Sequence, residues 1–164
     1  MTPSALVDTL REFHREKLVM RERHVAVARL VATYEFNNTY QYAIAREDTH
    51  LAWLEAALAD EGGTPDEVAA PTVPPLGRKA SVAPLVTEDA REAGEFAARW
   101  RPRLDGITHA RHRTMMGVVI GETLEHKRFF EQIADGHLDV LGRRSNGPGS
   151  PGTDGRVLPE RWME

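Results

Sequence analysis

The stretch that decides the fold is TYQYAIAREDTHLAWLEAALAD, residues 39–60. Its apolar residues recur at the spacing of one helix face, and Glu47 and His50 fall on that same face. Burying an unpaired charge is costly, so acids on a buried face are normally paired or bound to a metal ion. A Glu and a His three positions apart on a helix project to the same side, where one metal ion can bind both. The apolar members of the face are Phe36, Tyr40, Ala43, Leu54 and Ala57.

The residues before this stretch continue the helical pattern. Residues 4–61 contain neither Gly nor Pro and are rich in Ala, Leu, Arg and Glu, which favours helix. One straight helix of that length would extend about 87 Å, too long for a small domain, so the run must fold back. The two Asn residues within 35–39 tolerate turn geometry and predict the turn there. The first two helices are then expected at about 4–33 and 38–61; a break at 20–23 is the alternative.

The second half of the chain predicts another pair of helices. Residues 62–86 carry five of the ten prolines and form a long connection. A cap followed by acidic residues predicts a third helix over about 87–101, which Pro102 ends. A fourth helix is expected over about 107–135, closed by glycine. The remainder, 137–164, has the Gly/Pro-rich composition of a flexible tail.

This order predicts an all-α fold over residues 1–136: an antiparallel four-helix bundle made of two helical hairpins joined by a long crossover. A weak internal repeat agrees with two similar hairpins. His50-Leu-Ala-Trp-Leu-Glu55 and His126-Lys-Arg-Phe-Phe-Glu131 share His, an aromatic residue, a large apolar residue and Glu at the same offsets.

Composition narrows the classes of function. The absence of cysteine excludes disulfides, thiolate metal sites and thiol catalysis, so any metal must be held by oxygen and nitrogen ligands. A net charge of −4 gives no global basic excess, and we expect no nucleic-acid partner. No apolar run approaches the roughly eighteen residues of a membrane span. The amphipathic, charged start is unlike a signal peptide, and we expect a cytoplasmic protein.

Acidic residues and histidines recur on the other predicted inner faces. Glu122 and His126 lie in the stripe of the fourth helix, with Glu125 at its edge. The stripe of the first helix leaves room for Glu16, and Glu92 flanks the stripe of the third helix.

With these residues the chain resembles the ferritin-like di-iron carboxylate family, which includes bacterioferritins and rubrerythrins. In that family the first and third helices each give a Glu, and the second and fourth each give Glu-x-x-His. Glu47-Asp48-Thr49-His50 matches the second-helix motif. The fourth helix departs from it, because Thr123 stands three residues before His126. The ligands that the resemblance implies are Glu16, Glu47, His50, Glu92, Glu122, Glu125 and His126.

The resemblance implies a centre of two iron or manganese ions that reacts with dioxygen or peroxide, in an oxidoreductase or an iron-handling protein, and a possible homodimer. Tyr40, one helical turn before Glu47, would donate a hydrogen bond or an electron. The choice of first-helix ligand stays open, since a turn at 35–38 would place Glu22 or His24 level with Glu47. Asp89 is the alternative to Glu92 in the third helix.

Two other functions fit the same residues. The inner Glu and His residues could form a hydrogen-bonded network in a metal-free bundle that serves as a binding or scaffold module. A mononuclear site could instead use His50, His112 and His126. His109 and His112 also have the i, i+3 spacing of a metal pair. The final residues VLPERWME have the form of a segment that docks on a partner.

Overall fold

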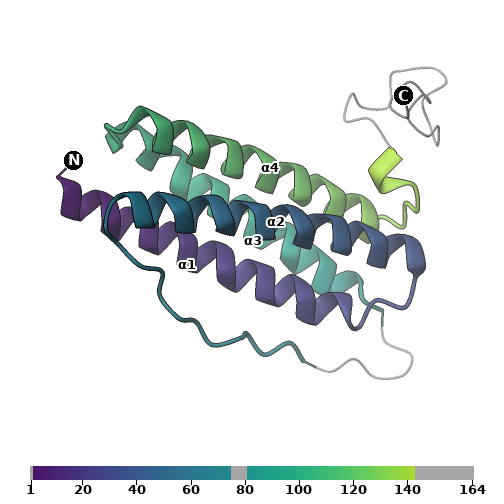
Figure 1. Cartoon of the computed structure of the whole chain (residues 1–164). Helices are drawn as coiled ribbons and strands as arrows, with labels where there is room; N and C mark the ends of the chain where they lie inside the picture. Colours follow the sequence, from purple (N-terminus) through teal and green to yellow (C-terminus); the bar gives the residue numbers. More distant parts are fainter. Residues whose placement is uncertain (1, 75–80, 143–164) are drawn as a thin grey trace, which may run out of the picture.

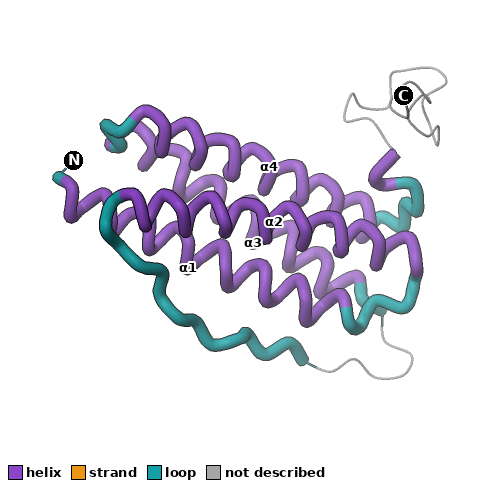
Figure 2. Tube along the Cα trace, viewed as in Figure 1, coloured by secondary structure: helices purple, strands orange, loops and turns teal. Residues whose placement is uncertain are grey.

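A computed structural model describes residues 2–74 and 81–142, and all regular structure in these residues is helical (Figure 2). The long helices are α1 (Pro3–Ala28), α2 (Tyr34–Asp60), α3 (Ala83–Trp100) and α4 (Ala110–Ala134). Two short 3-10 helices, η1 (Arg101–Gly106) and η2 (Val140–Gly142), follow α3 and α4. The prediction of an all-α fold is confirmed. None of the helices in the described residues combines the length and the apolar character needed to cross a membrane.

The helices pack as two pairs, α1 with α2 and α3 with α4, and further contacts join α2 to α4 and α1 to α3. Figure 1 shows the chain after α2 returning along the outside of α1 toward the opposite end of the bundle. Arg11 of α1 holds this segment by donating a hydrogen bond from Nε to the carbonyl oxygen of Thr64, 3.1 Å away. The end of α2 and the start of α4 consequently lie at the same end of the bundle.

The core consists of two apolar clusters separated along the bundle. One is centred on Phe13, Phe96 and Trp100, where the Phe13 and Trp100 rings meet edge to face with centroids 4.8 Å apart. The other contains Tyr40 and Phe130, with ring centroids 4.9 Å apart. Each fully buried apolar side chain contributes about 1.5–3 kcal/mol relative to exposure. The buried polar residues described below lie between these clusters.

The turn between α1 and α2 spans residues 29–33, so the predicted turn at 35–39 is wrong. Thr33 is the N-cap of α2, and the two Asn residues lie inside its first turns. Asn37 donates from its side-chain amide to the carbonyl oxygen of Ala28, 2.8 Å away, and so satisfies one of the open carbonyls at the end of α1. Asn37 therefore lies close to the turn without forming it: it stands in α2 and caps the C-terminal end of α1.

Helices α3 and α4 each begin at a different residue from the one predicted. Helix α3 begins at Ala83, four residues early, because Pro84 is well suited to the first helical turn, where no amide hydrogen is needed. Helix α4 begins at Ala110 and not at 107, with His109 as its N-cap. Pro102 falls in η1, as a residue that ends an α-helix should.

Part of the predicted flexible tail is folded. Val140 in η2 is 1% exposed and belongs to the same apolar cluster as Tyr40 and Phe130. Residues 143–164, including the predicted docking segment at 157–164, lie outside the described residues.

Candidate functional site

Buried polar side chains from all four long helices form a layer between the two apolar clusters. Each of these residues is no more than 2% exposed. Charges in such a place must be compensated inside the protein, because water cannot reach them. The residues are Lys17, His24, Glu47, His50, Asp89, Thr123 and His126.

Lys17 of α1 lies at the centre of this layer. Its ammonium donates a hydrogen bond of 3.0 Å to Glu47 Oε1 on α2 and another of 3.2 Å to Thr123 Oγ1 on α4. The second oxygen of Glu47 accepts from His24 Nδ1 at 2.8 Å. We call Lys17, His24, Glu47 and Thr123 the lysine network. It ties three helices together with hydrogen bonds in which at least one partner is charged.

The lysine network changes the titration of its members. Burial alone would raise the pKa of Glu47, but the positive charges of His24 and Lys17 lower it well below the ordinary value. Burial alone would lower the pKa of His24, but the Glu47 carboxylate outweighs it and raises that pKa. Glu47 is therefore an anion at neutral pH, held between the Lys17 ammonium and the His24 imidazole of α1.

Asp89 of α3 is the second fully buried carboxylate. Arg23 of α1 donates from Nε to Asp89 Oδ1 at 2.6 Å, and the Tyr40 hydroxyl donates to the other oxygen in a short hydrogen bond. Burial, together with the neighbouring Asp89 charge, raises the pKa of Tyr40, so its hydroxyl stays protonated. Tyr40 is thus a hydrogen-bond donor to a carboxylate.

His50 and Glu122 meet at the edge of the layer. His50 Nε2 donates to Glu122 Oε2 at 2.7 Å. Arg46 binds both oxygens of Glu122, at 2.9 and 2.7 Å, in the bidentate geometry that arginine favours with carboxylates. Burial raises the pKa of Glu122, but Arg46 and His50 lower it to a net value below normal. Both oxygens of Glu122 are therefore engaged by Arg46 and His50.

His126 follows Thr123 by three positions, as His50 follows Glu47. Its Nδ1 is buried and has no hydrogen-bond partner among the described residues. Burial, with Lys17 and His24 nearby, lowers the pKa of His126 to about 3, so the imidazole is neutral at physiological pH. Thr123 occupies the position where a second Glu-x-x-His motif would place its carboxylate, and it accepts a hydrogen bond from Lys17 there.

Three of the predicted ligands lie outside this layer. Glu16 binds Arg99 at 2.6 Å and the indole N–H of Trp100 at 3.1 Å. The Glu92 side chain is 33% exposed and lies 3.5 Å from Arg23, and Glu125 pairs with Arg128 on its own helix. Of the predicted and alternative residues, the structure thus brings together Glu47, His50, His126, His24, Asp89 and Tyr40, with Glu122 at the edge, and leaves out Glu16, Glu92 and Glu125.

The interior residues do not fit a centre of two metal ions. Such a centre needs several carboxylates turned toward a common space, whereas the two fully buried carboxylates, Glu47 and Asp89, each already bind a cationic side chain of α1. Lys17 Nζ also fills the space between Glu47 and Thr123. The predicted iron or manganese ions would have to displace this ammonium.

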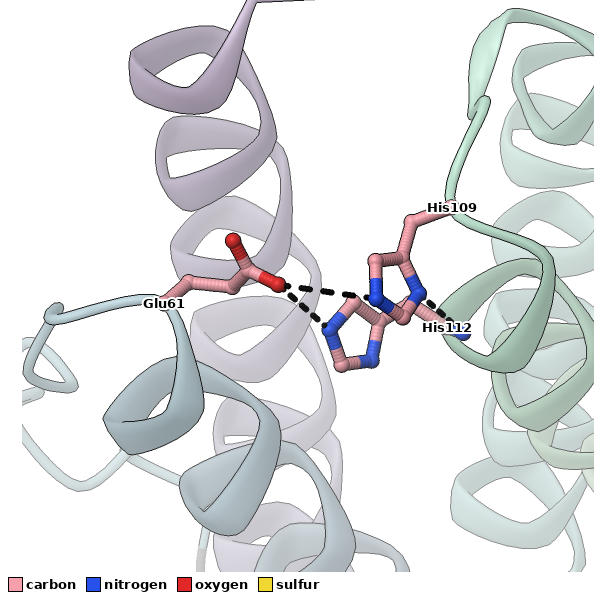
Figure 3. A group of neighbouring side chains, drawn as sticks. All are labelled: Glu61, His109 and His112. Atoms are coloured by element: carbon pink, nitrogen blue, oxygen red, sulfur yellow. Dashed lines mark hydrogen bonds and ion pairs between the residues drawn. The ribbon is translucent and has the colours of Figure 1, made fainter.

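A second group of polar residues lies at the end of the bundle, where α2 stops and α4 starts (Figure 3). Glu61 is the C-cap of α2, and Gly62, with a φ of 74°, turns the chain away directly after it. His112 Nε2 lies 3.0 Å and His109 Nε2 lies 3.8 Å from the same oxygen, Glu61 Oε1. The two imidazole rings stack with centroids 3.9 Å apart. We call these three residues the end cluster.

The end cluster is the one group of three His, Asp or Glu residues in the described part of the chain whose ligand atoms all lie within 4.8 Å of one another. The mononuclear set of His50, His112 and His126 is not such a group. The predicted pairing of His109 with His112 is present, and Glu61 is the carboxylate that joins it.

A groove between α2 and α4 begins beside the end cluster. It has a volume of about 560 Å³ and is lined mostly by apolar side chains. Trp53 and Val118 in its wall are 38% and 43% exposed. Arg46 lies over the Trp53 ring, with its guanidinium carbon 5.9 Å from the centroid. The other lining residues are Ala56, Ala57, Ala110, Arg111, His112, Thr114 and Met115.

The sequence did not predict two residues of these sites, Lys17 of the lysine network and Glu61 of the end cluster. Lys17 stands four residues after Phe13 and three before Met20, on the same face of α1. This spacing could have predicted that the lysine points inward. Glu61 stands 51 positions before His112 and lies beyond the last apolar residue of its helix, so no local pattern connects it to the two histidines.

Comparison of the chain with models of known protein families, with curated proteins and with solved structures found no match.

Proposed function

We propose that this chain is a ferritin-like four-helix bundle that works as a binding module for small, largely apolar molecules and has no metal centre in its interior. The ferritin-like arrangement is supported by the two helix pairs, α1 with α2 and α3 with α4, and by the long crossover between them. The single observation that carries the proposal of an interior without a metal centre is the position of Lys17, whose ammonium binds Glu47 and Thr123 in the middle of the bundle.

The lysine network supports a structural role for the interior. A lysine ammonium supplies one positive charge and three hydrogen-bond donors, and it carries no electrons to dioxygen or peroxide. The oxidoreductase function that the sequence suggests would require Lys17 to leave a site that it shares with Glu47. Tyr40 is likewise engaged with Asp89 as a hydrogen-bond donor.

The groove between α2 and α4 is the feature best suited to take a ligand. Its volume of about 560 Å³ is within the range of small-molecule sites, and its lining is mostly apolar with one exposed arginine, Arg111. A hollow of similar size, about 550 Å³, lies between α1 and α3, but its charged residues include the ion pairs Arg99–Glu16 and Arg91–Glu95. Aromatic and apolar walls distinguish the first groove.

The lining residues define a ligand with an aromatic or aliphatic body and a single negative charge. Trp53 offers a rigid aromatic wall, held from behind by Arg46 and by the His50 ring, whose centroid is 5.8 Å from that of the Trp53 ring. Arg111 at the rim would attract an anionic group, since its partner Asp60 is 3.5 Å away and its side chain is 77% exposed.

The binding half of the proposal is tested by calorimetric titration of the full chain with 2-naphthoate. We expect saturable binding that weakens at least about tenfold in Trp53→Ala, because an aromatic contact contributes about 0.5–1.5 kcal/mol beyond its buried area. Tyr34→Ala is the matched control, since Tyr34 is 78% exposed and does not line the groove. No binding, or equal binding by Trp53→Ala, would contradict the proposal.

The interior half is tested by loading the protein with ferrous iron or manganese and measuring the metal retained per chain after desalting. We expect Glu47→Gln to retain as much metal as the unchanged protein. Retention of two ions per chain by the unchanged protein, and their loss in Glu47→Gln, would contradict the proposal and support the di-metal oxidoreductase.

A further inference from the structure

We propose that the end cluster is a binding site for one divalent transition-metal ion, held by Glu61 at the end of α2 and by His109 and His112 at the start of α4. This site is separate from the interior and goes beyond the ligand that we propose for the groove, with which it shares His112 in the wall. It takes two nitrogen ligands and one oxygen ligand, a donor set that suits Zn²⁺, Co²⁺, Ni²⁺ and Fe²⁺.

The distances between the ligand atoms are close to those that a bound ion requires. Nitrogen and oxygen ligands lie about 2.0–2.2 Å from such an ion, so neighbouring ligand atoms stand about 3.0–3.4 Å apart in octahedral or tetrahedral geometry. The distances from Glu61 Oε1 are 3.0 Å to His112 Nε2 and 3.8 Å to His109 Nε2. All three ligand atoms lie within 4.8 Å of one another, so a rotation of the His109 side chain that brings its Nε2 closer would complete the set.

The three side chains are positioned without a metal ion. The His112 side chain is 3% exposed and fixed against the core, whereas the side chains of Glu61 and His109 are 21% and 43% exposed and leave a path from solvent. Figure 3 shows both imidazole rings presenting an edge to the same carboxylate. The two rings are stacked with an interplanar angle of 19°, so the more exposed His109 ring has to turn before both Nε2 lone pairs point at one ion.

Binding requires the Nε2 proton of both histidines to move. His112 Nε2 lies 3.0 Å from Glu61 Oε1, and because a carboxylate only accepts, the His112 proton is on Nε2. His109 Nδ1 accepts a hydrogen bond from the backbone N–H of His112 at 3.4 Å, which places its proton on Nε2. A metal ion on Nε2 displaces that proton, and the neutral ring then carries its proton on Nδ1. The hydrogen bond given up is long, beyond the ordinary range of about 2.7–3.2 Å, and the His109 ring must also turn so that its Nδ1 proton does not face the backbone N–H of His112.

The helix ends contribute little net field. The C-terminal end of α2 carries partial negative charge and attracts a cation, and the N-terminal end of α4 carries partial positive charge and repels it. Because the two ends adjoin the same site, the ligand atoms themselves must carry the affinity. Three protein ligands leave at least one coordination position for water.

The test uses Co²⁺, whose visible absorption reports its coordination, titrated into the full chain freed of metal with a chelator. We expect one ion per chain and a spectrum of nitrogen and oxygen ligation. Glu61→Gln and His109→Asn should each weaken binding at least about tenfold, since each removes a direct ligand. Asn is a strong N-cap residue, so His109→Asn preserves the start of α4.

His14→Gln is the matched control, because His14 and Glu55 form another histidine–carboxylate pair, 3.4 Å apart, without a second histidine. This variant and Glu47→Gln should bind Co²⁺ as the unchanged protein does. Circular dichroism and thermal melts without metal establish that all variants are folded. The absence of stoichiometric Co²⁺ binding would overturn the proposal, as would binding that both Glu61→Gln and His109→Asn retain or that Glu47→Gln abolishes.

Discussion

The lysine network and the end cluster are made of the same acidic and imidazole side chains and differ in what supplies the positive charge. In the network, Lys17 and His24 neutralise Glu47 inside the protein, where all three are at most 2% exposed. In the end cluster, Glu61 pairs with two histidines and, within the described residues, with no lysine or arginine, at a place that solvent reaches. A side-chain cation therefore occupies the place of a metal ion beside Glu47, whereas no such cation stands beside Glu61 among the described residues.

The largest expected effect comes from removing that internal cation. Lys17→Met leaves the Glu47 carboxylate buried with one charged partner fewer, and we expect a loss of about 3–5 kcal/mol in the free energy of unfolding. Urea denaturation measures it. The matched control is Lys127→Met, because Lys127 lies at the surface and pairs with Glu131 one helical turn away.

The double variant Lys17→Met/Glu47→Gln sharpens this result. Removing both charges leaves no buried ion to compensate, so the double variant should recover a large part of the stability that the single variant loses. A double variant that is as unstable as the sum of its parts would show that the two residues do not act as a pair.

The second prediction concerns Tyr40 and the other buried carboxylate. Tyr40→Phe keeps the ring and removes the hydrogen bond to Asp89, so we expect a loss of about 1.5–3 kcal/mol, the usual contribution of a hydrogen bond to a charged group. The same denaturation experiment measures it. Tyr42→Phe, at a position that is 46% exposed, should leave stability unchanged. A neutral effect of Tyr40→Phe would contradict the proposed structural role.

The third prediction is a pH dependence that arises from His126. Its pKa is lowered from 6.5 to about 3, so between these values the unfolded chain binds a proton that the folded protein excludes. Stability from this group is therefore complete above pH 6.5 and falls as the pH drops, by about 1.4 kcal/mol per pH unit. His126→Leu should reduce the slope by about half of that amount at pH 6.5 and by nearly all of it at pH 5, measured by urea denaturation.

Two neighbours of His126 titrate as well, and both can be separated from it. The pKa of His50 is also lowered, through burial, and adds a slope of the same sign in both proteins. The pKa of His24 is raised, so its contribution is present below pH 6.5 and is lost as the pH rises through its folded pKa. An unchanged slope in His126→Leu over pH 5 to 6.5 would show that this imidazole is not kept neutral.

Periodicity in the sequence predicted the helices and the buried face of α2. The stripe through residues 39–60 predicted a buried Glu47 and His50, and both are fully buried. Periodicity determines which face of a helix turns inward, and a face of Ala, Leu and aromatic residues leaves little choice. The absence of Gly and Pro over residues 4–61, followed by five prolines over 62–86, predicted helices and a long connection in the right order.

What the sequence could not provide is the partner of each charge. Lys17 has a long flexible stem, and nothing local decides whether such a side chain turns to solvent or reaches inward. Its contacts with Glu47 and Thr123 join residues 30 and 106 positions away. Glu61 meets His112 only because the crossover returns the chain so that α2 ends beside the start of α4.

The smallest expected effect is the one that completes the comparison, because the same substitution is made in both regions. Glu61→Gln in metal-free protein should change the free energy of unfolding by no more than about 1 kcal/mol, since the side chains of Glu61 and His109 are partly exposed to solvent. Glu47→Gln should lose more, because it leaves the Lys17 ammonium buried beside a neutral amide. Urea denaturation in the presence of a chelator measures both. Equal losses would mean that the end cluster is a structural pair like the lysine network, and a clear difference would leave it free to hold an ion.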